Sequence, residues 1–65
     1  MGRRYMIRIE APHFVAGVIV SGPAGSRVVV KAAPILRWSM GKPARELARW
    51  CERKRHRWMF WEIPD

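Results

Sequence analysis

The hydrophobic pattern of the N-terminal half predicts β-strands. Within residues 4–10, apolar and polar side chains alternate with a period of two, Met6 excepted, as in a strand with one solvated face. The segments 14–20 and 28–33 are almost wholly apolar and rich in β-branched residues, and the turn-forming stretch 21–26 separates them. We therefore predict a first strand followed by a hairpin of two central strands.

The pattern changes at Pro34, beyond which helices and one more strand are predicted. Pro34 suits the first position of a short helix that Gly41 ends. Pro43 then opens the main helix, which begins at about residue 42 or 43 and extends to Lys54. Period-two alternation resumes over 57–63 and predicts a last strand.

These elements predict a single α+β domain spanning residues 1–65, with the order β-β-β-α-β. Three sequential antiparallel strands precede the main helix, and the final strand joins them in one sheet that the helix covers on one face. The helix stripe that faces this sheet comprises Ala44, Leu47, Ala48 and Cys51. Arg55 would point into the stripe, so the helix ends before it. We expect an aromatic-rich core holding two or three tryptophans, and a less well covered opposite sheet face.

Composition excludes several classes of protein. A chain of 65 residues is too short for a second domain, and a hydrophobic content of 49% is typical of a folded protein. No apolar run is long enough to span a membrane, and the N-terminus lacks the features of a signal peptide. The single cysteine cannot form an internal disulfide, which fits a reducing cytoplasm.

Candidate catalytic and metal-binding groups are few. The five acids show no paired spacing of the kind that general acid–base catalysis uses. Cys51, His56 and His13 lack the paired spacing of metal ligands, and Cys51 is expected to be a core residue. We therefore predict that the protein is not an enzyme and holds neither a metal nor a cofactor.

The charge distribution is the main evidence for function. Thirteen Lys and Arg residues against five acids give a net charge of +8. On the main helix, cations recur every three or four residues within an arc of about 80° opposite the apolar stripe. These cations are Lys42, Arg45, Arg49 and Arg53. Two interpretations stay open: a solvated face that keeps the protein soluble, and a surface that binds phosphates.

Tryptophans stand next to arginines at three places in the chain, at positions 37–38, 49–50 and 57–58. Interleaved Arg and Trp stack bases and contact phosphates in single-stranded nucleic-acid binders, and they also anchor protein interfaces. Trp50 lies at the edge of the helix stripe and Trp58 alternates away from Met59 and Trp61, so we select these two as exposed anchors. The predicted binding residues are Lys42, Arg45, Arg49, Trp50, Arg53, Arg57 and Trp58.

Three short motifs resemble a family of small uncharacterised phage proteins. The motifs are the stretch 11–17 (APHFVAG), the stretch 33–36 (APIL) and Gly41-Lys42, and the resemblance covers most of the chain. Such proteins often have glycine where the helix joins the last strand, whereas this chain has Arg55-His56. The resemblance implies no catalytic residue. It implies binding to host machinery such as a polymerase, a nuclease or a CRISPR effector complex, and hence an anti-CRISPR or similar anti-defence role in the host cytoplasm.

The functional hypothesis is a non-catalytic basic protein that inhibits or modulates a host nucleic-acid-handling complex through the basic helix face and the tryptophans. One alternative is direct binding of DNA or RNA. A second is a membrane-surface activity of the basic and aromatic segment 53–61, although the alternation over 57–63 favours a folded strand and no membrane partner. A homodimer through the apolar strands and the uncovered sheet face is also left open.

Overall fold

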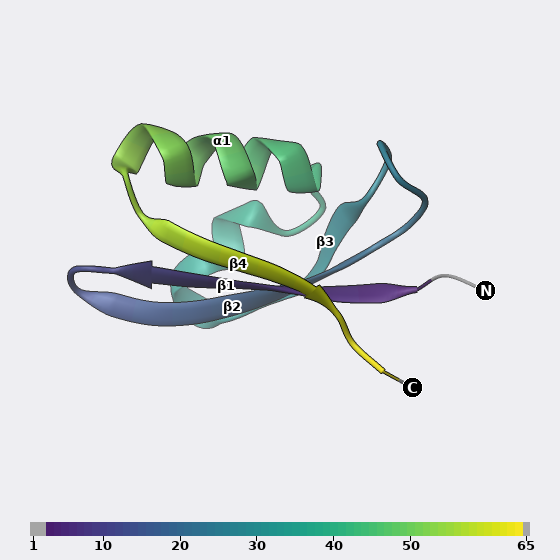
Figure 1. The fold of residues 1–65 in the computed structure, drawn as a ribbon, viewed down its shortest axis with the longest axis horizontal. Helices are drawn as coiled ribbons and strands as arrows, with labels where there is room; N and C mark the ends of the chain where they lie inside the picture. The colour runs from purple at the N-terminus through teal and green to yellow at the C-terminus, as the bar shows by residue number, and fades with distance from the viewer. Residues whose placement is uncertain (1–2, 65) are drawn as a thin grey trace.

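A four-stranded antiparallel sheet carries one α-helix across one face, in a computed structural model that describes residues 3–64 (Figure 1). The elements in chain order are β1 (Arg4–Ala11), β2 (Phe14–Ser21), β3 (Val28–Ala32), the 3-10 helix η1 (Pro34–Ser39), α1 (Ala44–Lys54) and β4 (Arg57–Glu62). The α+β class and the antiparallel sheet are therefore confirmed. Within the described residues, neither helix is long and apolar enough to cross a membrane.

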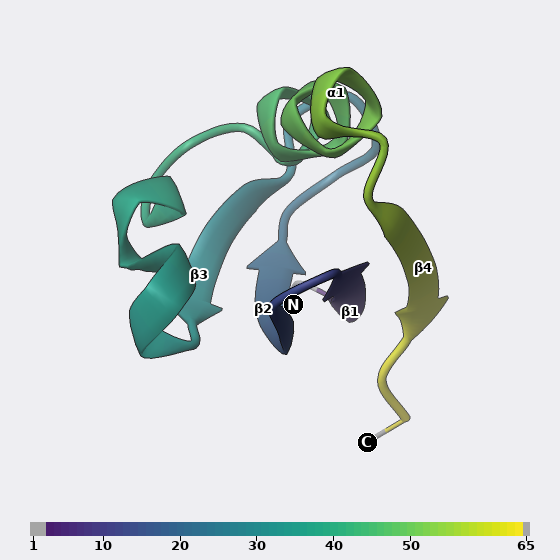
Figure 2. The ribbon, with the colours of Figure 1, turned by 90° about the vertical axis from the view of Figure 1, so that its left-hand side faces the viewer.

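The strand order β3-β2-β1-β4 makes β1 and β2 the central strands. The prediction that 28–33 is central is wrong, because the last strand returns beside β1 and leaves β3 at an edge. The outer side of β3 is occupied by the chain that leads into α1. There the Val29 N–H donates to the Lys42 carbonyl (3.0 Å) and the Gly41 N–H donates to the Val29 carbonyl (2.9 Å). Figure 2 shows η1 beside β3 and β4 at the opposite edge.

The core between sheet and helix is aliphatic. Its buried members are Ile7, Ile9, Val18, Val20, Val29, Leu36, Leu47 and Cys51. The expectation of buried tryptophans is wrong: Trp50 and Trp58 are half-buried and pack at the margin of this core. Apart from Leu47, the helix stripe consists of small residues, and the two indoles pack beside this layer rather than within it.

The two faces of β4 are the reverse of those predicted. Trp58 lies opposite Ile9, whose side chain is fully buried, so Trp58 and Phe60 face the helix. Met59 and Trp61 consequently face the open side of the sheet. Alternation alone does not say which face of a strand is inside when both faces carry apolar residues, and this is the origin of the error.

The ends of α1 are set by contacts with its neighbours. Pro43 keeps an extended conformation (φ −60°, ψ 142°), and the Ala44 N–H donates to the Arg27 carbonyl (2.9 Å), so the helix begins at Ala44 rather than at 42 or 43. At the other end α1 stops before Arg55, as predicted. Arg55 adopts the left-handed conformation (φ 58°), and its N–H donates to the carbonyls of Cys51 and Glu52.

Replacement of Arg55 by glycine should stabilise the domain. A residue with a Cβ is strained in the left-handed conformation and glycine is not, so Arg55→Gly is expected to raise the free energy of unfolding by about 1 kcal/mol. Arg53→Gly, which also removes one cation but lies within α1, should lower it by about 1 kcal/mol. Urea denaturation of both variants tests whether the two changes in the free energy of unfolding have opposite signs. A loss of stability in Arg55→Gly would contradict the backbone strain inferred at Arg55.

Candidate functional site

The basic face of α1 is exposed and lacks acidic partners. Arg45, Arg49 and Arg53 lie on α1, whereas Lys42, predicted to be in the same helical row, precedes the helix; all four are solvent-exposed, and we keep the name basic face for the four together. Within residues 3–64, ion pairs join only Arg3 to Glu62 (3.7 Å) and Arg8 to Glu10 (3.4 Å), both away from this helix. The cations of the helix face therefore carry charge that no described carboxylate compensates at contact distance.

A hollow of about 300 Å³ lies between η1 and α1, beside the basic face. It is lined by Trp38, Lys42, Glu46, Arg49, Trp50 and Arg53, and we call it the Trp38 hollow. The structure thus brings four of the predicted binding residues into one concave surface. Three of the lining side chains are cations and two are indoles, so the hollow offers phosphate donors and flat aromatic surface within one site.

A chain of aromatic contacts supports the Trp38 hollow from the core outwards. The rings of Phe14 and His56 meet edge to face (5.9 Å between centroids), as do those of His56 and Trp50 (5.2 Å). Trp38 completes the chain, with its ring centroid 5.0 Å from that of Trp50 and an interplanar angle of 62°. Trp38 is 44% exposed. Its indole is therefore held by packing on one side while the other side is open to solvent.

The exposed tryptophans are not the ones selected from the sequence. Trp50 and Trp58 are half-buried, whereas Trp38 and Trp61 are each 44% exposed. Trp38 is exposed because η1 turns Leu36 and Ser39 into the protein, where the Ser39 hydroxyl donates to the Leu36 carbonyl (2.6 Å). The signal for Trp38 in the sequence was the Arg37-Trp38 pair. Nothing in the sequence indicated that Ser39 would be buried, so the side of η1 that packs against the domain could not be predicted.

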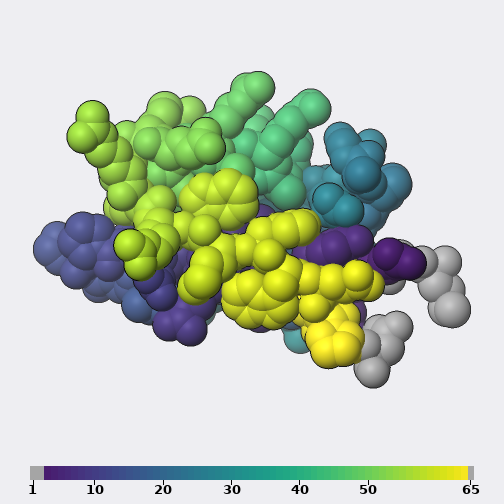
Figure 3. All heavy atoms as spheres, in the orientation of Figure 1, coloured from purple at the N-terminus to yellow at the C-terminus, as the bar shows by residue number. Residues whose placement is uncertain are grey.

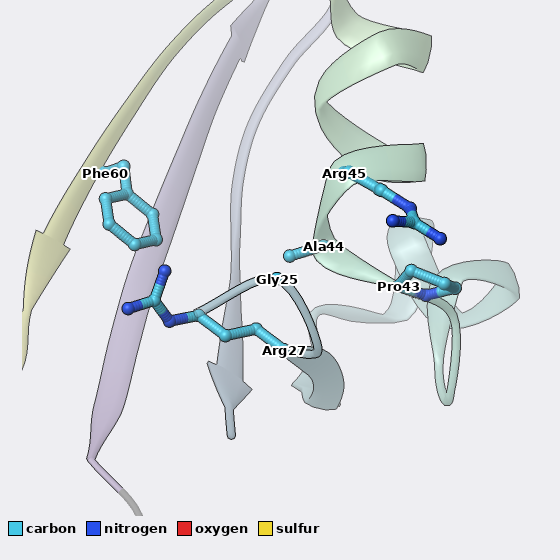
Figure 4. A pocket seen from close by; sticks show the side chains of 6 residues that line it. All are labelled: Gly25, Arg27, Pro43, Ala44, Arg45 and Phe60. Atoms are coloured by element: carbon cyan, nitrogen blue, oxygen red, sulfur yellow. The ribbon is translucent and has the colours of Figure 1, made fainter. Parts of the chain in front are cut away.

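Arg45 is among the lining residues of a different surface, a groove between α1 and β4. Its main hollow has a volume of about 260 Å³ and is almost wholly apolar, with the lining Ile7, Ala44, Arg45, Ala48, Trp58 and Phe60. A smaller hollow of about 150 Å³ continues it toward the β2–β3 loop (Figure 4). The α1–β4 groove therefore differs chemically from the Trp38 hollow, since it presents carbon surface with one arginine at its side.

Arg27, at the smaller end of the groove, is engaged by aromatic rings. Its guanidinium carbon lies 4.1 Å from the ring centroid of Tyr5 and 5.5 Å from that of Phe60. The two rings stack on each other, with centroids 5.1 Å apart and planes 9° apart. Figure 4 shows Arg27 directed toward Phe60 while Arg45 projects away from it. Cation–π contacts thus hold Arg27 in place, whereas Arg45 makes no such contact among the described residues.

Arg57 does not belong to either hollow. It lies opposite Glu10 in the β1–β4 ladder, on the open face of the sheet. The predicted binding residues therefore fall on three surfaces: the Trp38 hollow holds four of them, the α1–β4 groove holds Arg45 and Trp58, and the open face holds Arg57.

The potential nucleophile Cys51 is a core residue, as expected. It is fully buried, and burial, with a smaller contribution from the negative charge of Glu52, raises the pKa of its thiol to about 11. A thiol with so high a pKa is protonated at neutral pH and is a poor nucleophile. Among residues 3–64, no three His, Cys, Asp or Glu side chains lie together in an arrangement that would hold a metal ion.

Burial of the Cys51 thiol makes stability fall at high pH. The folded-state pKa of about 11 exceeds the ordinary value of 9.0. The unfolded chain therefore loses its thiol proton first, and the contribution of Cys51 is complete below pH 9 and is lost as pH rises from 9 to 11. We expect the free energy of unfolding to fall by about 1 kcal/mol between pH 8 and 10. Chemical denaturation of the native chain and of Cys51→Ala measures this, and an equal fall in both would contradict it.

The site was also compared with known proteins. Scans of the chain against protein-family models, curated proteins and solved structures find no match.

Proposed function

We propose that this protein is a non-catalytic binding protein that contacts the phosphates of a nucleic acid through the Trp38 hollow and the basic face of α1. The nucleic acid is held by a nucleic-acid-handling complex, whose function the bound protein inhibits or modulates. The observation that carries this proposal is the gathering of Lys42, Arg49 and Arg53 around an exposed indole, without a carboxylate paired to any of them among the described residues.

The geometry suits an unpaired strand more than a duplex. An indole open on one side, such as that of Trp38, can stack on a base that is turned out of a helix. The surrounding guanidinium and ammonium groups are then placed to contact the phosphates on either side of that base. The carboxylate of Glu46, which also lines the hollow, would repel phosphate groups near it and so restrict the path of the nucleic-acid backbone.

The host complex as target follows from the resemblance to small phage proteins, which also suggests the host cytoplasm as the place of action and a CRISPR effector as one such complex. The alternative is direct binding of free DNA or RNA by the same surface. A membrane-surface activity of the segment 53–61 is not favoured, because that segment is divided among the end of α1, the left-handed Arg55 and the strand β4.

The two targets are separated by affinity capture with and without nuclease. The tagged protein is incubated with lysate of a susceptible host, and the captured material is treated with a nonspecific nuclease before elution. A protein partner that the native chain captures before digestion, that nuclease releases together with its nucleic acid, and that Arg49→Glu/Arg53→Glu does not capture supports a nucleoprotein complex. A partner that nuclease leaves bound would contradict contact through phosphates. Capture of nucleic acid alone, which nuclease removes, supports the alternative. Capture of neither by the native chain would refute the proposed function.

A further inference from the structure

We propose that β4 is a dimerisation strand, and that two copies of this chain pair their β4 edges antiparallel across a two-fold axis at Phe60. The resulting eight-stranded sheet would place both helices on the same side. This inference is independent of the proposed nucleic-acid contact, which uses the opposite side of α1.

Strand β4 is the open edge of the sheet. The other edge, β3, is covered by the chain around Gly41 and Lys42, as described above. Among the described residues no strand pairs with β4 on the side away from β1. In the space-filling view, β4 and its side chains run uncovered across the front of the molecule beneath α1 (Figure 3).

The outer side of β4 presents backbone hydrogen-bonding groups that β1 does not use. The Ile63 N–H donates to the carbonyl of Arg4 (2.9 Å), one step beyond the Tyr5–Glu62 pair of the ladder. Along a strand of an antiparallel ladder, the N–H and C=O groups of successive residues point alternately toward the neighbouring strand and away from it; we call the latter residues outward. The N–H and C=O groups of Met59 and Trp61 therefore point toward β1, and those of Trp58, Phe60 and Glu62 point away from it. These three residues supply the donors and acceptors for another strand.

The sequence of β4 matches itself in one register. A regular antiparallel ladder joins outward residues to outward residues, and the register that pairs all three of them places Phe60 opposite the partner's Phe60 and Trp58 opposite the partner's Glu62. On the open face, Met59 then lies opposite the partner's Trp61. Met59, Phe60 and Trp61 are 41%, 42% and 44% exposed in the single chain, and each gains an apolar neighbour in this register.

Strand β4 lacks the features that protect edge strands from pairing. Proteins commonly place lysine, proline or a bulge on an exposed edge. Residues 57–62 contain neither lysine nor proline, and the register with β1 runs without a shift. The two ends of β4 also carry opposite charges, Arg57 and Glu62. Antiparallel pairing brings the ends of opposite charge together, whereas parallel pairing would bring Arg57 close to the partner's Arg57.

Charge explains why salt should strengthen this dimer. Each copy carries a net charge of +8, so association works against repulsion that salt screens. Phosphate binding has the opposite dependence, because salt weakens it. The two proposals can therefore be refuted separately with the same protein preparation, because salt changes dimerisation and nucleic-acid binding in opposite directions.

Sedimentation equilibrium of the nucleic-acid-free protein, over a range of concentrations and at low and high NaCl, tests the proposal. We expect the native chain to pass from monomer to a closed dimer, with tighter association at high salt. Met59→Lys places a charge in the interface and should weaken association at least about tenfold. Ile35→Lys adds the same charge at an exposed residue of η1 (54% exposed) and should dimerise like the native chain.

A second matched pair tests the backbone groups. Glu62→Pro removes an outward N–H, which the ladder with β1 does not use, and Glu62→Ala removes the same side chain but keeps that N–H. The two-fold axis places residue 62 in the interface twice, so Glu62→Pro removes two hydrogen bonds. We expect Glu62→Pro to dimerise about 10- to 100-fold more weakly than Glu62→Ala, with the circular dichroism of both unchanged. A native chain that stays monomeric at both salt concentrations, or grows beyond a dimer, overturns the proposal. Dimerisation that Met59→Lys and Glu62→Pro leave unchanged also overturns it.

Discussion

Charge reversal at Arg49 and Arg53 is expected to lower the affinity for a single-stranded oligonucleotide by about 100-fold at 0.1 M salt. Both side chains line the Trp38 hollow, and neither makes an ion pair within the described residues. Their replacement by glutamate therefore removes two phosphate contacts and adds repulsion without breaking an internal interaction. Fluorescence anisotropy of a labelled oligonucleotide of mixed sequence measures the loss.

The control for this prediction carries the same change in net charge elsewhere. Arg4→Glu/Lys31→Glu reverses two exposed cations on the open face of the sheet, away from α1. Long-range attraction falls equally in both double variants, so we expect this control to lose less than about tenfold in affinity. Equal losses in the two double variants would mean that the oligonucleotide responds to total charge and that the helix face has no special role.

Trp38→Ala is expected to weaken the same binding by about 10- to 100-fold. The indole of Trp38 is the exposed aromatic surface of the hollow, and a base that stacks on such a ring contributes about 1 to 3 kcal/mol. Trp38→Phe should recover part of the affinity, because a smaller ring still stacks. Ile35→Ala, in the same 3-10 helix but outside the hollow, should bind like the native chain.

Loss of the Trp38 ring also removes its edge-to-face contact with Trp50, so folding is checked in parallel by urea denaturation. A folded Trp38→Ala that binds with native affinity would show that phosphate contacts act without base stacking. The salt dependence of Trp38→Ala should match that of the native chain, since the substitution removes no phosphate contact.

The order of the elements was predictable because it depends on local patterns. The alternation over 4–10, the turn formers between 21 and 26, and the two prolines before α1 each act within a few residues. The position of β3 in the sheet was not predictable in this way. It depends on the pairing of β4 with β1, a contact between segments far apart in the chain that leaves no trace in local hydrophobicity.

Part of the candidate site was predictable because helical periodicity is also a local pattern. Helical geometry alone places Arg49 and Arg53 on one side of α1. Lys42 was predicted to continue this helical row, but it precedes the helix and lines the same hollow from the preceding loop. The exposure of the aromatic side chains was not predicted correctly, because Trp50 lines the hollow but is half-buried. Whether Trp38 or Trp50 is exposed depends on how η1 packs against the domain, and η1 packs with Leu36 and Ser39 buried.

The salt dependence of oligonucleotide binding tests most directly whether the basic helix face contacts phosphates. Contacts from Lys42, Arg49 and Arg53, the three cations of the Trp38 hollow, predict that the logarithm of the association constant falls with the logarithm of the salt concentration, with a slope of about −2 on a single strand. Arg49→Glu/Arg53→Glu should reduce the steepness of this slope by at least about 1.4. Binding with a slope near zero would contradict the account, because the ligand would then be held by something other than its phosphates.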